Sequence, residues 1–175
     1  MGRAGLIAAA ALLGVAAPAA ARLESVGPDG FVSRSEALIP HTPTSVWAAL
    51  INWSAWWDLA HSYSGKPGAL TLELPPGGLL NEIWPGGNVV HAQVVNAMPP
   101  RLLRLHGGFG PLQALPVNAV LDFTLKPEGD GTRLTMTYRV AGAPASKLDT
   151  LAAPVDAVMS AGFARLVNFA QAGKP

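Results

Sequence analysis

The stretch from Leu121 to Val140, LDFTLKPEGDGTRLTMTYRV, decides the fold. On both sides of its centre apolar residues alternate with polar or charged ones, which is the two-residue period of a strand with one buried face. Gly129-Asp130-Gly131 separates the two runs and supplies residues that tolerate a positive φ. This stretch therefore predicts an antiparallel hairpin with one face on the core and one in water.

Upstream of this hairpin, further short apolar runs predict a longer antiparallel meander. From Leu70 onward they are separated by clusters of turn residues, namely Pro75-Pro76-Gly77-Gly78, Pro85-Gly86-Gly87 and Pro99-Pro100. Phe31 to Ile39 is predicted to be the first strand, although Arg34 and Glu36 interrupt its apolar positions. We expect about six to seven strands in one curved antiparallel sheet.

Two short helices are expected directly after the first strand. Thr42-Pro43 combines an N-cap with proline at the first helical position, and the apolar positions 46, 47, 50 and 51 follow at helical spacing. A second helix is predicted from Ser54 to about Ala60, with Ser54 as its cap.

The C-terminal segment returns to a helical period. From Ser146 onward a single stripe holds the apolar positions 148, 151, 155, 159, 162, 166 and 169. Pro154 removes one helical hydrogen bond, so we expect a kink there, or a new helix beginning near Ala153 after a separate turn at 148–152. No linker or repeat divides residues 22–175, which are predicted to form one α+β domain.

This order of elements resembles the helix-grip fold of the START-related SRPBCC superfamily, which includes polyketide cyclases and lipid-transfer proteins. Within it the sequence is similar to the activators of the heat-shock chaperone ATPase. The segments that carry the resemblance are Ile39 to Trp47, Trp56 to Gly65, Gly107 to Gln113 and the helix after Leu151, within a region from Phe31 to Ala170. The resemblance implies a sheet gripping a long C-terminal helix, with a cavity between them that accepts apolar molecules.

The N-terminus predicts export. Arg3, the uncharged run from Ala4 to Ala17 and the small residues that end at Ala21 are typical of a cleavable signal peptide, residues 1–21, with cleavage after Ala21. The run is shorter than the ~20 apolar residues that span a bilayer, so no stable membrane insertion is expected after cleavage. We therefore predict a secreted or periplasmic protein.

Composition excludes several classes of function. Loss of Arg3 leaves 11 Lys and Arg residues against 11 Asp and Glu residues, so nothing favours nucleic-acid binding. The chain has no cysteine, which excludes disulfides, thiolate nucleophiles and cysteine-ligated zinc. No spacing of the four histidines indicates a metal site, and no cofactor motif is present.

Glu82 and His91 are the candidate catalytic residues. They flank the Pro85-Gly86-Gly87 turn, so pairing of 79–84 with 89–95 would place them on neighbouring strands, where a carboxylate beside an imidazole forms an acid/base pair. The competing interpretation, which the alternation of the strand favours, is that His91 lies on the exposed face between Val90 and Ala92.

Other candidate ligand-binding residues lie near the expected pocket. They are Trp56, Trp57, His61, Tyr63 and Trp84, in addition to Glu82 and His91. Adjacent helical positions point about 100° apart, so Trp56 and Trp57 are not both expected to face the core, and one of them is a candidate for contact with the pocket or with a partner. Packing in the core or in a loop is the alternative role for each of these side chains.

Three functions follow from these patterns. The first is an exported binding protein for an apolar or amphipathic small molecule. The second is a cyclase or dehydratase type of enzyme, in which residues of the same pocket move protons, and the sequence leaves open whether any reaction occurs. The third is a module that binds a protein partner through an exposed tryptophan patch.

Overall fold

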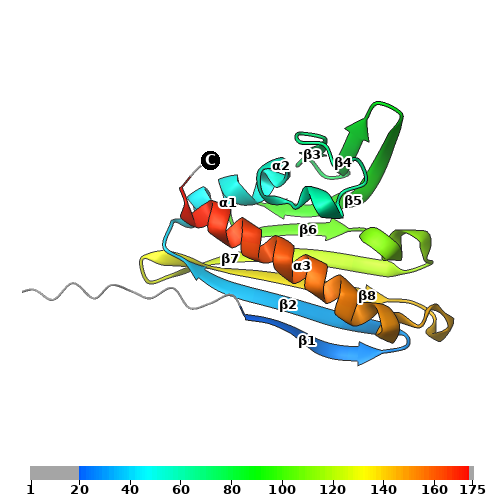
Figure 1. Cartoon of the computed structure of the whole chain (residues 1–175). Coiled ribbons are helices and arrows are strands. Elements are labelled where there is room, and N and C mark those ends of the chain that lie inside the picture. The colour runs from blue at the N-terminus through cyan, green and yellow to red at the C-terminus, as the bar shows by residue number, and fades with distance from the viewer. Residues whose placement is uncertain (1–19, 174–175) are drawn as a thin grey trace, which may run out of the picture.

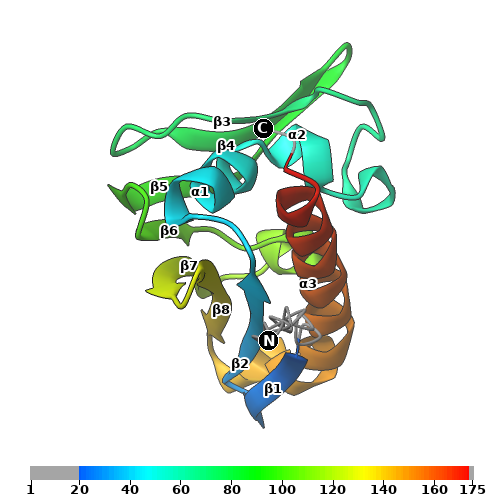
Figure 2. The same ribbon diagram turned by 90° about the vertical axis from the view of Figure 1, so that its left-hand side faces the viewer.

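A computed structural model describes residues 20–173 as one curved eight-stranded antiparallel sheet that wraps a long helix (Figures 1 and 2). The order across the sheet is β1-β2-β8-β7-β6-β5-β4-β3. The elements in chain order are β1 Ala20–Gly27, β2 Gly30–Ile39, α1 Pro43–Ile51, α2 Trp53–Trp56, η1 Leu59–His61, β3 Leu70–Leu72, β4 Leu79–Trp84, β5 Gly87–Met98, β6 Leu102–His106, η2 Gly110–Ala114, β7 Asn118–Glu128, β8 Gly131–Ala141, η3 Pro144–Ser146 and α3 Leu148–Gln171. The predicted helix-grip α+β architecture is confirmed.

The sheet has more strands than the sequence predicted. The predicted first strand is β2, and β1 precedes it, joined by a tight turn at Pro28 and Asp29. The sequence marks β1 only by that turn, because charged residues such as Arg22 and Glu24 break its apolar pattern. Residues 1–19 of the predicted signal peptide lie outside the described residues.

The strands around the hairpin follow the predicted alternation closely. β2 alternates strictly between buried and partly exposed positions, and its buried face includes the serines Ser33 and Ser35. Those serines, rather than Arg34 and Glu36, are what blurred the pattern in the sequence. The β7–β8 hairpin is confirmed, with Gly129 at a φ of 55° in its turn.

The first short helix is confirmed and the second is corrected. Thr42 caps α1 by accepting a hydrogen bond from the backbone N–H of Ser45. The predicted helix from Ser54 to Ala60 is instead the single turn α2, which follows Asn52 and ends before Trp57, and the separate turn η1. Trp57 takes an extended conformation and breaks the helical run.

α3 is continuous through Pro154, so the predicted separate turn at 148–152 is wrong. Pro154 removes only one hydrogen bond near the start of a 24-residue helix, and Ala152 and Val155 are buried on both sides of it.

Among the described residues α3 has the length and apolar character to cross a membrane. Its apolar stripe packs against the concave face of the sheet, where the core lies.

Candidate functional site

An apolar cavity of about 240 Å³ lies between α3 and the concave face of the sheet. Its α3 wall consists of Pro154, Val155, Val158 and Met159, which lie on consecutive turns. The remaining lining residues come from the loops and from β5, and they are Trp57, His61, Tyr63, His91, Phe109, Gly110 and Pro111. The cavity therefore occupies the place between sheet and helix that the resemblance implied.

Phe109 is fixed in the cavity wall by a buried tyrosine. The Tyr138 hydroxyl donates to the carbonyl of Gly107 at 3.0 Å and accepts from the N–H of Phe109 at 3.1 Å. Burial raises the pKa of Tyr138, although the hydrogen bond from Phe109 partly opposes this, so the hydroxyl stays protonated. These two bonds tie the loop after β6 to the central strand β8.

His91 forms the polar part of the cavity wall because β5 contains a bulge. The pairing of β4 with β5 runs from Leu80 opposite Ala92 to Asn81 opposite Val90, so His91 is the extra residue. As a result His91 and Ala92 are both buried on the concave face. The interpretation of His91 as an exposed residue is wrong for this reason.

Glu82 lies behind His91 and is fully buried. Its Oε2 atom is 3.0 Å from Nε2 of His91 and accepts from the N–H of Tyr63 at 3.0 Å, while Oε1 accepts from the N–H of Ser64. The predicted placement of the two residues on one face of neighbouring strands is confirmed. Glu82 does not line the cavity, so it acts on a ligand only through His91 and the loop that it holds.

The side chains of Glu82 and His91 differ in charge. Burial opposes ionisation of Glu82, but hydrogen bonds from Ser64, Tyr63 and His91 outweigh it and lower the pKa to about 2. Burial also lowers the pKa of His91, and the neighbouring Glu82 carboxylate only partly offsets that effect. At neutral pH the site therefore holds a carboxylate and an uncharged imidazole.

The mouth of the cavity is formed by the loop that Glu82 anchors. Tyr63 is 52 % exposed, its ring centre lies 5.7 Å from that of His91, and its hydroxyl donates to Oε1 of Gln113 at 2.7 Å. Gln113 in turn donates to the carbonyl of Val90 at 2.8 Å. His61 is exposed at the same mouth. The predicted residues His61 and Tyr63 thus meet His91 around one opening.

The tryptophans do not form an exposed patch. Trp56 and Trp57 are 2 % and 8 % exposed, so both are buried, which contradicts the expectation that they do not both face the core. Trp57 is buried because it leaves the helix and packs on Gly162 of α3, where a Cβ atom would lie 2.7 Å from the ring. Only Trp57 of this pair lines the cavity, and Trp84 stacks over Gly87 at the β4–β5 turn, away from it.

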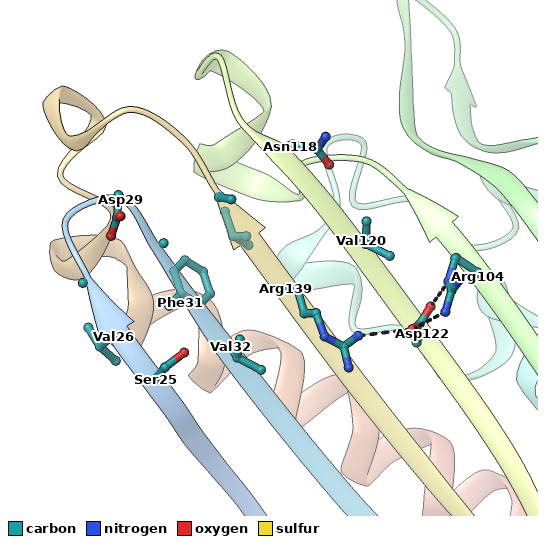
Figure 3. Close-up of a pocket in the computed structure, with 14 residues that line it drawn as sticks. Ser25, Val26, Asp29, Phe31, Val32, Arg104, Asn118, Val120, Asp122 and Arg139 are labelled. Atoms are coloured by element: carbon teal, nitrogen blue, oxygen red, sulfur yellow. Dashed lines mark hydrogen bonds and ion pairs between the residues drawn. The ribbon is translucent and has the colours of Figure 1, made fainter.

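A larger hollow of about 800 Å³ lies on the outer face of the sheet, but it is open to solvent. Figure 3 shows Arg104, Asp122 and Arg139 on this face, with α3 behind the strands. Asp122 accepts from Arg104 at 2.7 and 3.0 Å and from Arg139 at 3.2 Å. Both arginines of this hollow already pair with Asp122, so the less open inner cavity is the better candidate site.

Metal binding has no geometric support within residues 20–173, where no three His, Asp or Glu side chains are placed to share an ion. The site instead consists of apolar walls and one Glu82–His91 pair.

The sequence analysis missed the aromatic wall at Phe109 and the aliphatic wall at Val158. A signal for the second wall was present, because 155, 158 and 159 share one face of a helix.

Comparisons with known proteins agree with this architecture. A family model described as polyketide cyclase / dehydrase and lipid transport matches residues 31–171. No curated protein matches the chain. Among solved structures, a Rhodobacter sphaeroides protein has 21% sequence identity and a TM-score of 0.58, with coverage of 85% of this chain and 96% of that one.

Two other solved structures show the same fold. A Mycobacterium smegmatis protein has 16% identity and a TM-score of 0.58, with 90% of this chain and 96% of that one covered. A Nitrosomonas europaea protein has 16% identity and a TM-score of 0.57, with 84% and 97% covered.

The family match spans most of the chain, whereas similarity to the chaperone ATPase activators stays a prediction. The eight-stranded sheet, the gripped helix and the family match lead to one conclusion: this chain belongs to the polyketide cyclase / dehydrase and lipid transport family of the SRPBCC superfamily.

Proposed function

We propose that the protein binds an apolar or amphipathic small molecule in the cavity beneath α3. The observation that carries this proposal is the cavity of about 240 Å³ whose walls are apolar except near His91 and the mouth. Small-molecule sites have this composition, with a few polar groups that orient the ligand. A cavity of about 150 Å³ holds benzene, so this one accommodates a molecule of one or two rings.

Cavity filling tests the proposal. Val158→Trp places a large ring in the space, whereas Ala161→Trp, on an exposed position one turn away, leaves it unchanged. We expect Val158→Trp to abolish binding of 2-methylnaphthalene in a protein-observed NMR titration, and Ala161→Trp to bind it like the wild type. Equal binding by both variants would place the ligand elsewhere.

The Glu82–His91 pair favours a second candidate, an enzyme of cyclase or dehydratase type. An uncharged imidazole held by a buried carboxylate is able to take a proton from a bound substrate. His91→Ala would then leave binding largely intact and abolish turnover. Equal loss of both would count against catalysis and favour a carrier.

Export of the protein is also part of the proposal. Cleavage after Ala21 would remove the first two residues of β1 and leave its pairing from Arg22 to Gly27 in place. N-terminal sequencing of the protein from its natural source tests this, and a chain that begins at Met1 would contradict it.

A further inference from the structure

The imidazole of His91 has one ring nitrogen in use and one free. Nε2 lies 3.0 Å from Oε2 of Glu82. In the part of the chain that the structure describes, Nδ1 has no hydrogen-bond partner. It is also not one of the side-chain atoms that are both buried and unpaired, which are Oγ of Ser35, Oγ of Ser160 and Nε1 of Trp53. Nδ1 is therefore without a protein partner and remains accessible.

The partner of Nε2 determines what Nδ1 can do. The Glu82 carboxylate only accepts hydrogen bonds, and it already receives the N–H groups of Tyr63 and Ser64. The proton of the neutral ring must therefore be on Nε2, which donates it to Glu82. Nδ1 is left with a lone pair and acts as an acceptor.

We propose that the cavity selects uncharged ring compounds that carry a hydroxyl group, and that this hydroxyl donates a hydrogen bond to Nδ1 of His91. This inference rests on the proposed small-molecule function and names the ligand class for the same cavity. Trp57 and Phe109 contribute aromatic surface to the cavity wall, which suits a ring compound. A carboxylate is disfavoured, because it offers no donor to Nδ1 and would approach the buried charge of Glu82.

Paired ligands test the hydroxyl. 2-Naphthol and 2-methylnaphthalene have the same ring system and nearly the same shape, and only the first donates a hydrogen bond. The Kd of each is measured by protein-observed NMR for the wild type and for His91→Phe, which keeps a flat ring and removes the acceptor. For each protein the Kd of 2-methylnaphthalene is divided by the Kd of 2-naphthol. Comparing this ratio between the wild type and His91→Phe cancels the different hydration of the two ligands.

We expect His91→Phe to reduce the preference for 2-naphthol by about 3- to 10-fold, the size of one ordinary hydrogen bond. We also expect the wild type to bind 2-naphthoate more weakly than 2-naphthol. An unchanged ratio, or tighter binding of 2-naphthoate, overturns the inference while the cavity function stands. Failure of all three compounds to bind the wild type overturns the proposed function as well.

A measurement on the wild type covers the case in which His91→Phe does not fold. The ¹⁵N resonances of His91 should show a proton on Nε2 and none on Nδ1 in the free protein. Addition of 2-naphthol should shift the Nδ1 resonance, and addition of 2-methylnaphthalene should leave it near its free value. Protonated Nδ1, or equal shifts with both ligands, would contradict the assignment.

Discussion

Glu82→Gln tests whether the buried carboxylate is held as an anion by its hydrogen bonds. The new amide can keep its oxygen toward Tyr63 and His91, but its NH₂ group then faces the N–H of Ser64, which loses its acceptor. A buried donor without a partner costs about 1–3 kcal/mol. The remaining bonds also lose the contribution of the negative charge.

The lowered pKa of Glu82 expresses the effect of these hydrogen bonds as a magnitude. Its drop from 4.5 to about 2 corresponds to about 3 kcal/mol of stability at pH 7, because each pKa unit is worth about 1.4 kcal/mol. The folded-state pKa is the lower one, so this stability is present above pH ~4.5 and is lost as the pH falls through ~2. At pH 3 about 1.4 kcal/mol of it remains.

Urea unfolding of wild type and Glu82→Gln at pH 7 and pH 3 measures this effect. We expect the variant to be less stable by about 3 kcal/mol at pH 7 and by about half of that at pH 3. Glu73→Gln is the matched control, because Glu73 is exposed and should change stability by less than about 0.5 kcal/mol. A deficit for Glu82→Gln that is below about 1 kcal/mol at pH 7, or that does not vary with pH, would refute the reasoning.

Three further substitutions probe the frame around the cavity by thermal or chemical unfolding. Gly162→Ala should destabilise the protein by about 1–2 kcal/mol despite the better helix propensity of alanine, because the new methyl group overlaps the buried ring of Trp57; stabilisation would contradict this packing. Tyr138→Phe should lower the free energy of unfolding by about 1–3 kcal/mol. It should also weaken 2-methylnaphthalene binding, because Phe109 loses its hydrogen bond to the Tyr138 hydroxyl, and unchanged affinity would show that this bond is dispensable. Thr42→Ala should cost about 1 kcal/mol through the lost cap of α1 and leave ligand affinity unchanged; full retention of stability would argue against the cap.

Much of the fold could be predicted from local patterns. Strict alternation fixed the β7–β8 hairpin, and Thr42-Pro43 fixed the start of α1, because in both cases the local preference agrees with the tertiary packing. β1 was missed because Arg22 and Glu24 obscure its apolar positions, and its stability comes from pairing with β2. Pairing of this kind leaves little trace in a single strand.

The candidate site was less predictable because it depends on departures from regular geometry. The bulge at His91 reverses the face that alternation assigns to this residue. Trp57 takes an extended conformation, so the 100° spacing of adjacent helical positions does not determine the direction of its side chain. Neither departure has a signal in the sequence as clear as a glycine or a proline. The pairing of Glu82 with His91 was accessible because the turn between them sets two neighbouring strands side by side.

Native mass spectrometry of the protein recovered from the cells that naturally express it tests the central claim most directly. The native protein should carry an excess mass that disappears on denaturation and that belongs to a compound small enough for about 240 Å³. The same preparation of Val158→Trp should lack this mass, while Ala161→Trp should retain it. A compound that Val158→Trp retains in full would contradict the assignment of the cavity beneath α3 as the binding site.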